Sequence, residues 1–391
     1  MRSSALRTTL AGPIAVSLAL AACGRDSTGP DPASPSLTRA GTEADAGGAV
    51  YTSTNGASAN AILAFRRAED GALTPIGSFP SGGRGTGGAV DPLASQYAVI
   101  LSADHHLLFT VNAGSNDVTS YRVGDDGGLI LADRRSAGGT LPVSLASRGG
   151  LLYVLNAGDN TVAGLRVDPR GKLIAIPQGT RRLASGAGGA STIHFSADGR
   201  SVIVTERTAN RLETLAVEAS GRLGEPVVTA SSGAVPFGFD VTAGGVAVVS
   251  EAGGTAATAP NSGVSSYATG GSGTLSLLTG SIDAGGKAAC WVVVTADGTA
   301  FVANSASNAI ASVRVNGDGS LALLDAVAGA TPSGATPIDI DLSTGDRFLY
   351  ALEAGSGNIG LFAVDGATLT PGTAVPSGAV GASGLQGIAA F

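Results

Sequence analysis

Two stretches of the sequence decide its fold: LLYVLNAGDNTVAGLRVDPRGKL (Leu151–Leu173) and, 44 residues earlier, LLFTVNAGSNDVTSYRVGDDGGL (Leu107–Leu129). Asn112 and Asn156 hold matching places in the two stretches. A repeat of about 40–50 residues is typical of the blades of a β-propeller, each of which is a four-stranded antiparallel sheet. The period therefore predicts a ring of blades.

The pattern recurs through most of the 391 residues and gives seven copies in all. The five further copies contain AVYTSTNGASANAILAF (Ala49–Phe65), SVIVTERTANRLETLAV (Ser201–Val217), VAVVSEAGG (Val246–Gly254), TAFVANSASNAIASVRV (Thr299–Val315) and FLYALEAGSGNIGLFAV (Phe348–Val364). We expect an all-β, seven-bladed propeller over residues 49–391, with strands A to D in each blade.

The ends of the repeat array predict how the ring closes. The array starts with a B strand at residue 49 and ends with an A strand, GLQGIAAF (Gly384–Phe391). Pairing the last strand with the N-terminal strands closes the ring and removes an exposed sheet edge. We also expect a full A strand at QYAVILS (96–102) and a D strand at LTPGTAV (Leu369–Val375).

The connections between strands divide into two faces. The A–B and C–D turns are short and rich in Asp-Gly, which suits tight hairpins. The B–C and D–A loops share the opposite face, and Ser81–Ser95 and Glu251–Ser262 are the longest of them. Variable loops on a rigid scaffold commonly carry function. A ligand is therefore expected where these loops meet around the axis.

The N-terminal segment is typical of an exported lipoprotein. Arg2 and Arg7 precede a short apolar stretch, and Leu20-Ala21-Ala22-Cys23 resembles a lipobox. Residues 1–22 are predicted to be a signal peptide, and residues 23–48 a flexible tether that starts at lipidated Cys23. The alternative is a plain secretory signal. We expect a monomer on a membrane surface in the bacterial cell envelope.

Composition argues against nucleic acids and metal ions as partners. The formal net charge is −7, so nucleic-acid binding is not expected. No His, Cys and Glu spacing suggests a zinc site, and no cofactor or metal is expected. The abundance of glycine, 60 residues, makes matches to glycine-rich phosphate motifs uninformative.

The repeated units resemble the lactonase family of seven-bladed propellers, which includes 6-phosphogluconolactonases and carboxymuconate-lactonising enzymes, and related YVTN-type surface propellers. The resemblance is carried by the LYVxNAGxNTV wording and by the SADGR turn at Ser196–Arg200. It implies a catalytic glutamate at Glu206. Other family positions differ: Ala190-Ser191-Thr192 replaces a Pro-Arg-His, Asn304-Ser305 replaces an Asn-Arg, and Val143 follows Pro142 in place of a histidine.

Two functions therefore remain open. One is an extracytoplasmic propeller that binds a ligand or partner and has a degenerate family site. The other is a hydrolase or isomerase of a lactone or other cyclic ester that uses Glu206. Whether the protein is an enzyme is left open.

The candidate site residues lie where B strands end on the loop face, or beside the axis. A catalytic role is predicted for Glu206, and ligand-binding roles for Arg207, Glu251, Glu353, Asn304 and Trp291. The alternatives for the carboxylates are a solvated rim or side chains that cap neighbouring loops. The alternative for Trp291, beside Cys290, is packing. His194 is expected to be a structural polar residue between blades, with a catalytic role as the alternative.

Overall fold

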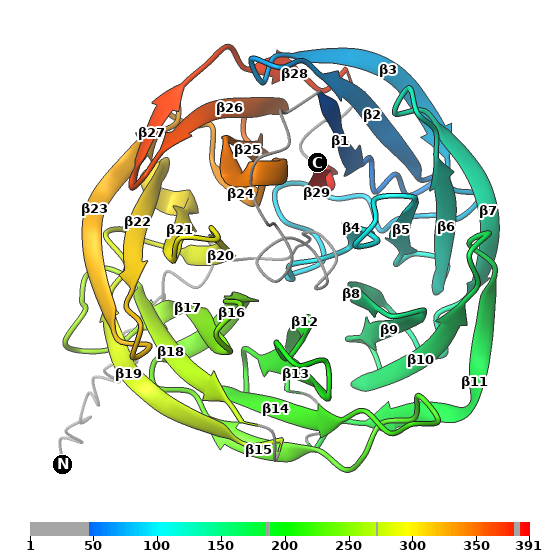
Figure 1. The fold of residues 1–391 in the computed structure, drawn as a ribbon, viewed down its shortest axis with the longest axis horizontal. Coiled ribbons are helices and arrows are strands. Elements are labelled where there is room, and N and C mark those ends of the chain that lie inside the picture. The colour runs from blue at the N-terminus through cyan, green and yellow to red at the C-terminus, as the bar shows by residue number, and fades with distance from the viewer. Residues whose placement is uncertain (1–46, 185, 187, 271–272, 379–383) are drawn as a thin grey trace, which may run out of the picture.

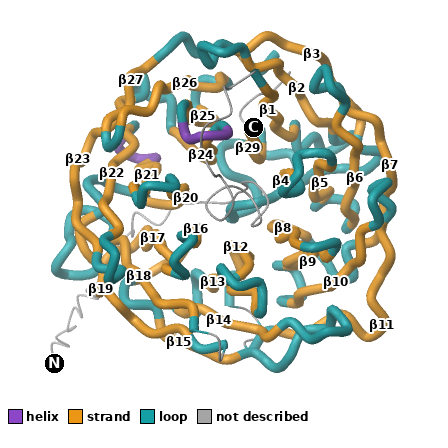
Figure 2. The backbone as a smooth tube through the Cα atoms, in the orientation of Figure 1, coloured by secondary structure: helices purple, strands orange, loops and turns teal. Residues whose placement is uncertain are grey.

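A computed structural model describes residues 47–391 apart from 185, 187, 271–272 and 379–383. The predicted signal peptide, Cys23 and the tether as far as residue 46 lie outside the described residues. Among the residues described, none forms a helix with the length and hydropathy that a membrane crossing requires. The described part of the chain has two short helical turns, η2 (Ser305–Ser307) and η3 (Thr344–Asp346), and both are 3-10 helices (Figure 2).

The described residues form seven antiparallel sheets arranged as blades around an axis (Figure 1). The predicted seven-bladed propeller with four-stranded blades is confirmed. In the order A to D, the strands of the first three blades are β29 (Gln386–Ala390), β1 (Gly48–Ser53), β2 (Ala61–Arg67) and β3 (Leu73–Pro80); β4 (Val99–Leu101), β5 (Leu107–Asn112), β6 (Asp117–Val123) and β7 (Leu129–Ser136); β8 (Pro142–Arg148), β9 (Leu151–Asn156), β10 (Thr161–Val167) and β11 (Leu173–Arg182).

The remaining four blades follow the same order. Their strands are β12 (Ala190–Phe195), β13 (Ser201–Glu206), β14 (Arg211–Ala216) and β15 (Val227–Ala230); β16 (Ala234–Val241), β17 (Val246–Gly254), β18 (Gly263–Thr269) and β19 (Leu275–Asp283); β20 (Ala289–Val294), β21 (Thr299–Asn304), β22 (Ala309–Val315) and β23 (Leu321–Ala330); β24 (Pro337–Leu342), β25 (Phe348–Glu353), β26 (Asn358–Asp365), β27 (Thr368–Pro371) and β28 (Val375–Pro376).

The C-terminal strand closes the ring as the sequence predicts. β29 pairs with β1, with Val50 opposite Ala390. A β-carbon on Gly48 would lie 1.9 Å from the carbonyl oxygen of Phe391, so only glycine fits there. Arg67 Nε donates to that same oxygen at 2.9 Å. The first blade is therefore built from both ends of the described chain.

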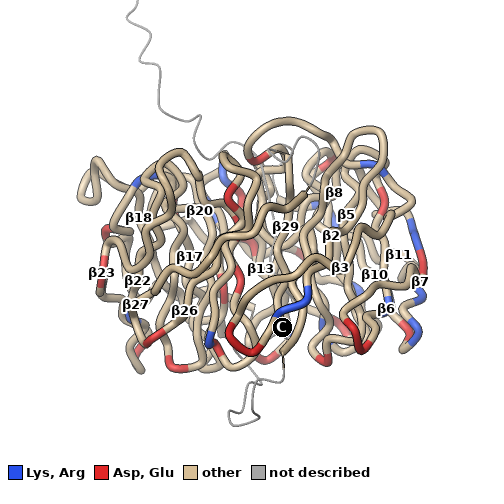
Figure 3. Tube along the Cα trace, turned by 90° about the horizontal axis from the view of Figure 1, so that it is seen from above, with Lys and Arg blue, Asp and Glu red and all other residues tan. Residues whose placement is uncertain are grey.

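The core lies between the blades, because each sheet packs both faces on its neighbours. One apolar cluster, for example, joins Ile203 and Leu212 of the fourth blade to Phe239, Val249 and Tyr267 of the fifth. The charged residues lie largely toward the ends of the strands, as the side view shows (Figure 3). Tight packing between neighbours fixes the blades around the axis and so positions their loops.

Two strand predictions are wrong in their extent. The seventh blade's outer strand is split into β27 and β28, and both pair with β26. The predicted A strand at residues 96–102 is reduced to β4, since only Val99–Leu101 pair with β5 as a strand. The segment between β3 and β4 (cyan in Figure 1) instead runs into the centre of the ring.

Candidate functional site

The aligned residues that end the B strands are buried. Their exposed fractions are 0–1% for Asn112, Asn156, Glu206, Glu251, Asn304 and Glu353. A solvated rim is therefore excluded for the three carboxylates. Buried polar groups need hydrogen-bond partners, and the partners show what these positions do.

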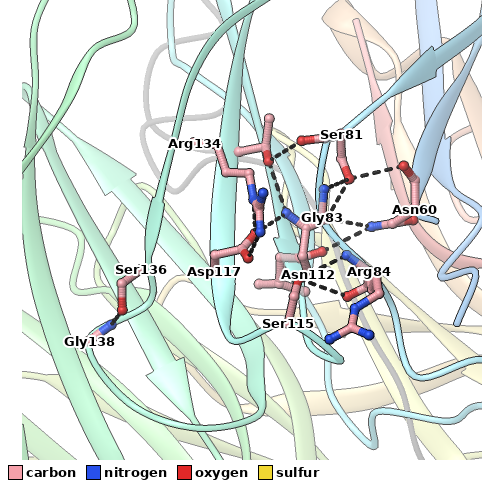
Figure 4. Close-up of polar contacts among 12 residues, drawn as sticks. Asn60, Ser81, Gly83, Arg84, Asn112, Ser115, Asp117, Arg134, Ser136 and Gly138 are labelled. Carbon is pink, nitrogen blue, oxygen red and sulfur yellow. Dashed lines mark hydrogen bonds and ion pairs between the residues drawn. The ribbon is translucent and has the colours of Figure 1, made fainter. Parts of the chain in front are cut away.

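Asn112 ties the second blade to the first (Figure 4). Its Oδ1 accepts from Ser81 Oγ at 2.7 Å and from Asn60 Nδ2 at 2.9 Å, and both donors precede the second blade. Its Nδ2 donates to Asp117 at 2.7 Å. Asp117 in turn pairs with Arg134 on the outer strand. The repeated asparagine thus joins neighbouring blades.

The same position in three further blades bonds to the linker that precedes its own blade. The contacts join Asn156 Nδ2 to the Ala137 carbonyl (3.1 Å), Asn304 Nδ2 to the Ala284 carbonyl (2.8 Å), and the Gly233 N–H to Glu251 Oε1 (2.7 Å). In these three blades the two asparagines donate to a linker carbonyl, and the glutamate accepts from a linker N–H. These contacts explain Asn304 and Glu251 as blade-joining residues, and their binding of a ligand stays a prediction.

Glu206 lies in a buried ionic cluster between the third and fourth blades. It accepts from Asn160 Nδ2 at 2.8 Å and from Arg211 Nε. Arg211 also pairs with Glu213 at 2.6 Å, and Glu213 accepts from the N–H of Ala184 in the preceding linker. Burial, followed by the contact with Glu206, raises the pKa of Glu213 to about 7. The family's glutamate is therefore engaged in holding two blades together.

Glu353 in the seventh blade has a hydrogen-bond partner within its own blade. Ser356 Oγ, in the following turn, donates to its carboxylate at 3.0 Å. Burial raises the pKa of Glu353, and the bond from Ser356 acts in the opposite direction. The three glutamates thus each have partners in their own part of the ring.

The long loop before the second blade fills the axis of the propeller. Gln96 donates its Nε2 to the Val292 carbonyl at 2.8 Å, and its own N–H to Thr192 Oγ1 at 3.1 Å. Tyr97 donates its hydroxyl to the Phe239 carbonyl at 2.9 Å. Residues 91–98, here called the plug, therefore bond to inner strands from across the ring.

Close approach requires glycine on the inner strand that faces the plug. A β-carbon on Gly238 would lie 2.0 Å from Gln96 Oε1. Within the plug, Ala94 has a φ of 60° and Tyr97 a φ of 75°, a strained conformation for residues other than glycine. Surrounding contacts must therefore hold the segment in place.

Residues that replace the family's motif hold the plug. Ser191 Oγ donates to the Ala94 carbonyl at 2.7 Å, beside the bond between Thr192 and Gln96. Trp291, fully buried, donates its Nε1 to the Ser95 carbonyl at 3.2 Å. The packing alternative for Trp291 is thus supported by its contacts, and its binding of a ligand stays a prediction.

Asp91, at the start of the plug, is the residue that the sequence analysis missed. Its exposed fraction is 1%, so the carboxyl is buried, whereas the preceding Val90 is 40% exposed. Neither carboxyl oxygen has a hydrogen-bond partner among the described residues. Burial raises the pKa of Asp91 well above its usual range, and the charge of Arg207 opposes this shift. An Asp-Pro pair within a loop of glycine and alanine was the available signal.

Arg207 follows β13 and faces the same region of the axis. Its guanidinium lies over the ring of Phe237, 5.5 Å from the centroid. Phe237 meets Trp291 edge to face at 5.3 Å. Asp91, Arg207, Phe237 and Trp291, here called the axial cluster, come from four separate parts of the chain. The cluster combines a cation, a carboxyl group and aromatic rings.

His194 lies on β12 with polar and aromatic neighbours. Burial lowers its pKa to about 4, so the ring is neutral near pH 7. Its Nδ1 is 2.8 Å from the Phe195 carbonyl, and its Nε2 is 3.6 Å from Asp240 Oδ1. Asp240 also accepts from the Val294 N–H of the next blade at 2.8 Å. These contacts support the structural interpretation of His194. Within the described ranges, no group of three His, Cys, Asp or Glu residues is placed to hold a metal.

Residues 146–256 match the family model described as lactonase, seven-bladed β-propeller. The resemblance to the lactonase family is confirmed. No curated protein matches the chain.

Solved structures extend the likeness over most of the chain. The periplasmic gluconolactonase of Pseudomonas aeruginosa has 20% identity and a TM-score of 0.68, with 88% of this chain and 98% of that chain covered. A candidate 6-phosphogluconolactonase of Bacteroides fragilis has 16% identity and a TM-score of 0.66, with 85% and 95% covered.

Virginiamycin B lyase of Staphylococcus aureus has 14% identity and a TM-score of 0.52, with 74% of this chain and 87% of that chain covered. At these identities the likeness shows the fold, and different chemistries share that fold.

Proposed function

We propose that this protein is a lactonase-like propeller of the cell envelope that binds a small polar molecule at the axial cluster. We place the site on the loop face, where the charge of Arg207 acts on Asp91. Arg207 is thus retained as a ligand-binding residue, while Glu206 serves the fold. The lipid anchor at Cys23 and the extracytoplasmic location remain part of the proposal.

One observation carries the binding role. A buried carboxyl group with two unpartnered oxygens is destabilising, because desolvation of each polar atom is left uncompensated. Asp91 has this property within a plug whose other polar atoms are well bonded. An unsatisfied buried group requires an explanation, and a ligand that completes the hydrogen bonding is the one proposed here. The neighbouring Arg207 adds a cation suited to polar ligands.

Two observations disfavour catalysis by Glu206. Its carboxylate is fully buried, and it already accepts hydrogen bonds from Asn160 and Arg211. A general base must reach the proton that it removes. Ser191 and Thr192, in place of the family's basic residues, hold the plug and so serve structure.

Hydrolysis of a lactone, or isomerisation to one, is the second candidate function. It is favoured by the lactonase family match and by the gluconolactonase and 6-phosphogluconolactonase names of similar structures. It requires Glu206 to act as acid or base, so Glu206→Gln would abolish turnover.

The test uses the full chain, purified in detergent, with a panel of sugars, sugar acids and lactones. Calorimetry measures binding, and titration of released acid measures lactone opening. We expect saturable binding that Arg207→Gln abolishes and that Glu206→Gln retains. Absence of binding across the panel contradicts the proposal. Turnover that is lost in Glu206→Gln supports the second candidate instead.

A further inference from the structure

We infer that the axial cluster is a receptor for a small carboxylate, in which Asp91 is a neutral hydrogen-bond donor and Arg207 supplies the positive charge. This inference rests on the proposed function and specifies its ligand chemistry.

The first step concerns the charge of Asp91. An ionised carboxylate away from water needs several donors around its oxygens. Asp91 has no such donor among the described residues, although the charge of Arg207 acts on it. Arg207 is the charged residue that lowers the pKa of Asp91, and its effect is smaller than that of burial. The protonated carboxyl, which carries no charge, is therefore the stable form.

The second step concerns what the pair can bind. A protonated carboxyl donates through its O–H, and a guanidinium only donates. Together they offer hydrogen-bond donors and one positive charge. The ligand that matches these two donors is an anion with two acceptor oxygens. A carboxylate fits best, because its two oxygens match the planar guanidinium. A ligand carboxylate would accept from Asp91 with one oxygen and face Arg207 with the other.

The third step concerns the rigidity of the site. The plug that carries Asp91 is bonded to inner strands through Ser95, Gln96 and Tyr97. Phe237 lies beneath the guanidinium of Arg207 and is itself held by Trp291. Both donors are therefore positioned before a ligand arrives, which reduces the entropic cost of binding.

The experiment compares gluconate with sorbitol, which replaces the carboxylate by a hydroxymethyl group. Acetate is the minimal carboxylate probe. Each is titrated into the full chain in detergent, over a range of pH, with proton uptake measured calorimetrically in two buffers. We expect gluconate and acetate to bind, sorbitol not to bind, and affinity to fall as rising pH ionises Asp91.

Two variants of Asp91 separate its roles. Asn and Gly both suit the φ of 56° at this position. Asp91→Asn keeps a neutral donor, so we expect a gluconate affinity within a few-fold of wild type. This affinity should not show the fall with rising pH that ionisation of Asp91 causes in the wild type. Asp91→Gly removes the donor, so we expect a loss of about ten- to a hundredfold, the usual value of a hydrogen bond to a charged group. Asp125→Asn, an exposed turn residue, is the control.

The outcomes distinguish this inference from the proposed function. If sorbitol binds as tightly as gluconate, or Asp91→Asn loses binding as Asp91→Gly does, the site binds a ligand but the inference is wrong. If neither carboxylate binds while another member of the panel does, the inference is again wrong. Infrared difference spectra of wild type against Asp91→Asn provide a ligand-free check. Absence of a protonated carboxyl band at neutral pH contradicts the inference.

Discussion

The hydroxyl of Tyr97 donates to the carbonyl of Phe239 at 2.9 Å, although 142 positions separate the two residues in the sequence. This bond joins the plug to the inner strand of the fifth blade. It shows that the axis is filled by a segment of the chain itself. We therefore place the proposed ligand site beside the plug, around Asp91 and Arg207.

Tyr97→Phe should destabilise the protein by about 1 kcal/mol, because the Phe239 carbonyl loses its buried partner. Thermal and chemical unfolding measure the change. Tyr121→Phe is the matched control, since its hydroxyl makes a longer bond of 3.3 Å to the Phe79 carbonyl at the edge of a blade. An equal or larger loss in the control would show that the plug bond adds nothing special.

Asn112→Ala should cost about 2–4 kcal/mol of unfolding free energy, because several buried partners lose their bonds together. Asn116, in the same repeat but exposed, accepts from the Leu141 N–H at 2.7 Å. Asn116→Gly should cost about 1 kcal/mol or less, since water can replace the lost acceptor. Similar losses for the two variants would contradict the assignment of Asn112 as a buried joint between blades.

Glu213 should make stability fall as pH rises from about 4.5 to about 7. Its pKa in the folded protein is raised to about 7, from 4.5, chiefly by burial. The folded state therefore binds more protons than the unfolded state in this window, and deprotonation favours unfolding. Glu213→Gln should flatten this part of the stability profile. If the dependence of stability on pH is unchanged in the variant, a group other than Glu213 titrates in this range.

Deletion of Gly384–Phe391 should open the ring and destabilise it severely. The deletion removes β29, its pairing with β1, and the carbonyl that accepts from Arg67. Circular dichroism and thermal unfolding of the truncated chain test this. Melting at the wild-type temperature would refute the closure.

Cys23→Ala should abolish incorporation of labelled palmitate during growth and release the protein from the membrane fraction. The expectation comes from the lipobox-like residues before Cys23. Equal labelling of variant and wild type would exclude lipidation at this residue.

The repeats made the fold predictable, while the site depended on contacts that no local pattern reveals. The spacing of Asn112 and Asn156 gave the blade period, and the final A strand gave the closure. The same asparagines could not be assigned roles from sequence, because their partners lie in the linkers that precede their blades. The sequence predicts a catalytic role for Glu206 and a ligand-binding role for Glu251, and the buried partners of both residues became visible only in the folded ring.

The sequence does not predict the plug, because residues 96–98 fit the pattern of an A strand. Gln96, Tyr97 and Ala98 precede Val99 as an apparent strand, but contacts across the axis outweigh strand pairing there. Local propensity is readily overridden by such tertiary contacts. Asp91 was missed in consequence, since its burial follows from the path of the plug.

The axial cluster can be tested directly through Trp291, the one tryptophan of the sequence. It contacts the plug at Ser95 and packs on Phe237, which lies under Arg207. Its fluorescence should therefore respond when a ligand occupies the site. Titration of the full chain with gluconate should produce a saturable change in Trp291 emission that Arg207→Gln abolishes and Glu206→Gln retains. A saturable change that persists in Arg207→Gln, or gluconate binding without any change in emission, would contradict a site at Arg207 and Asp91.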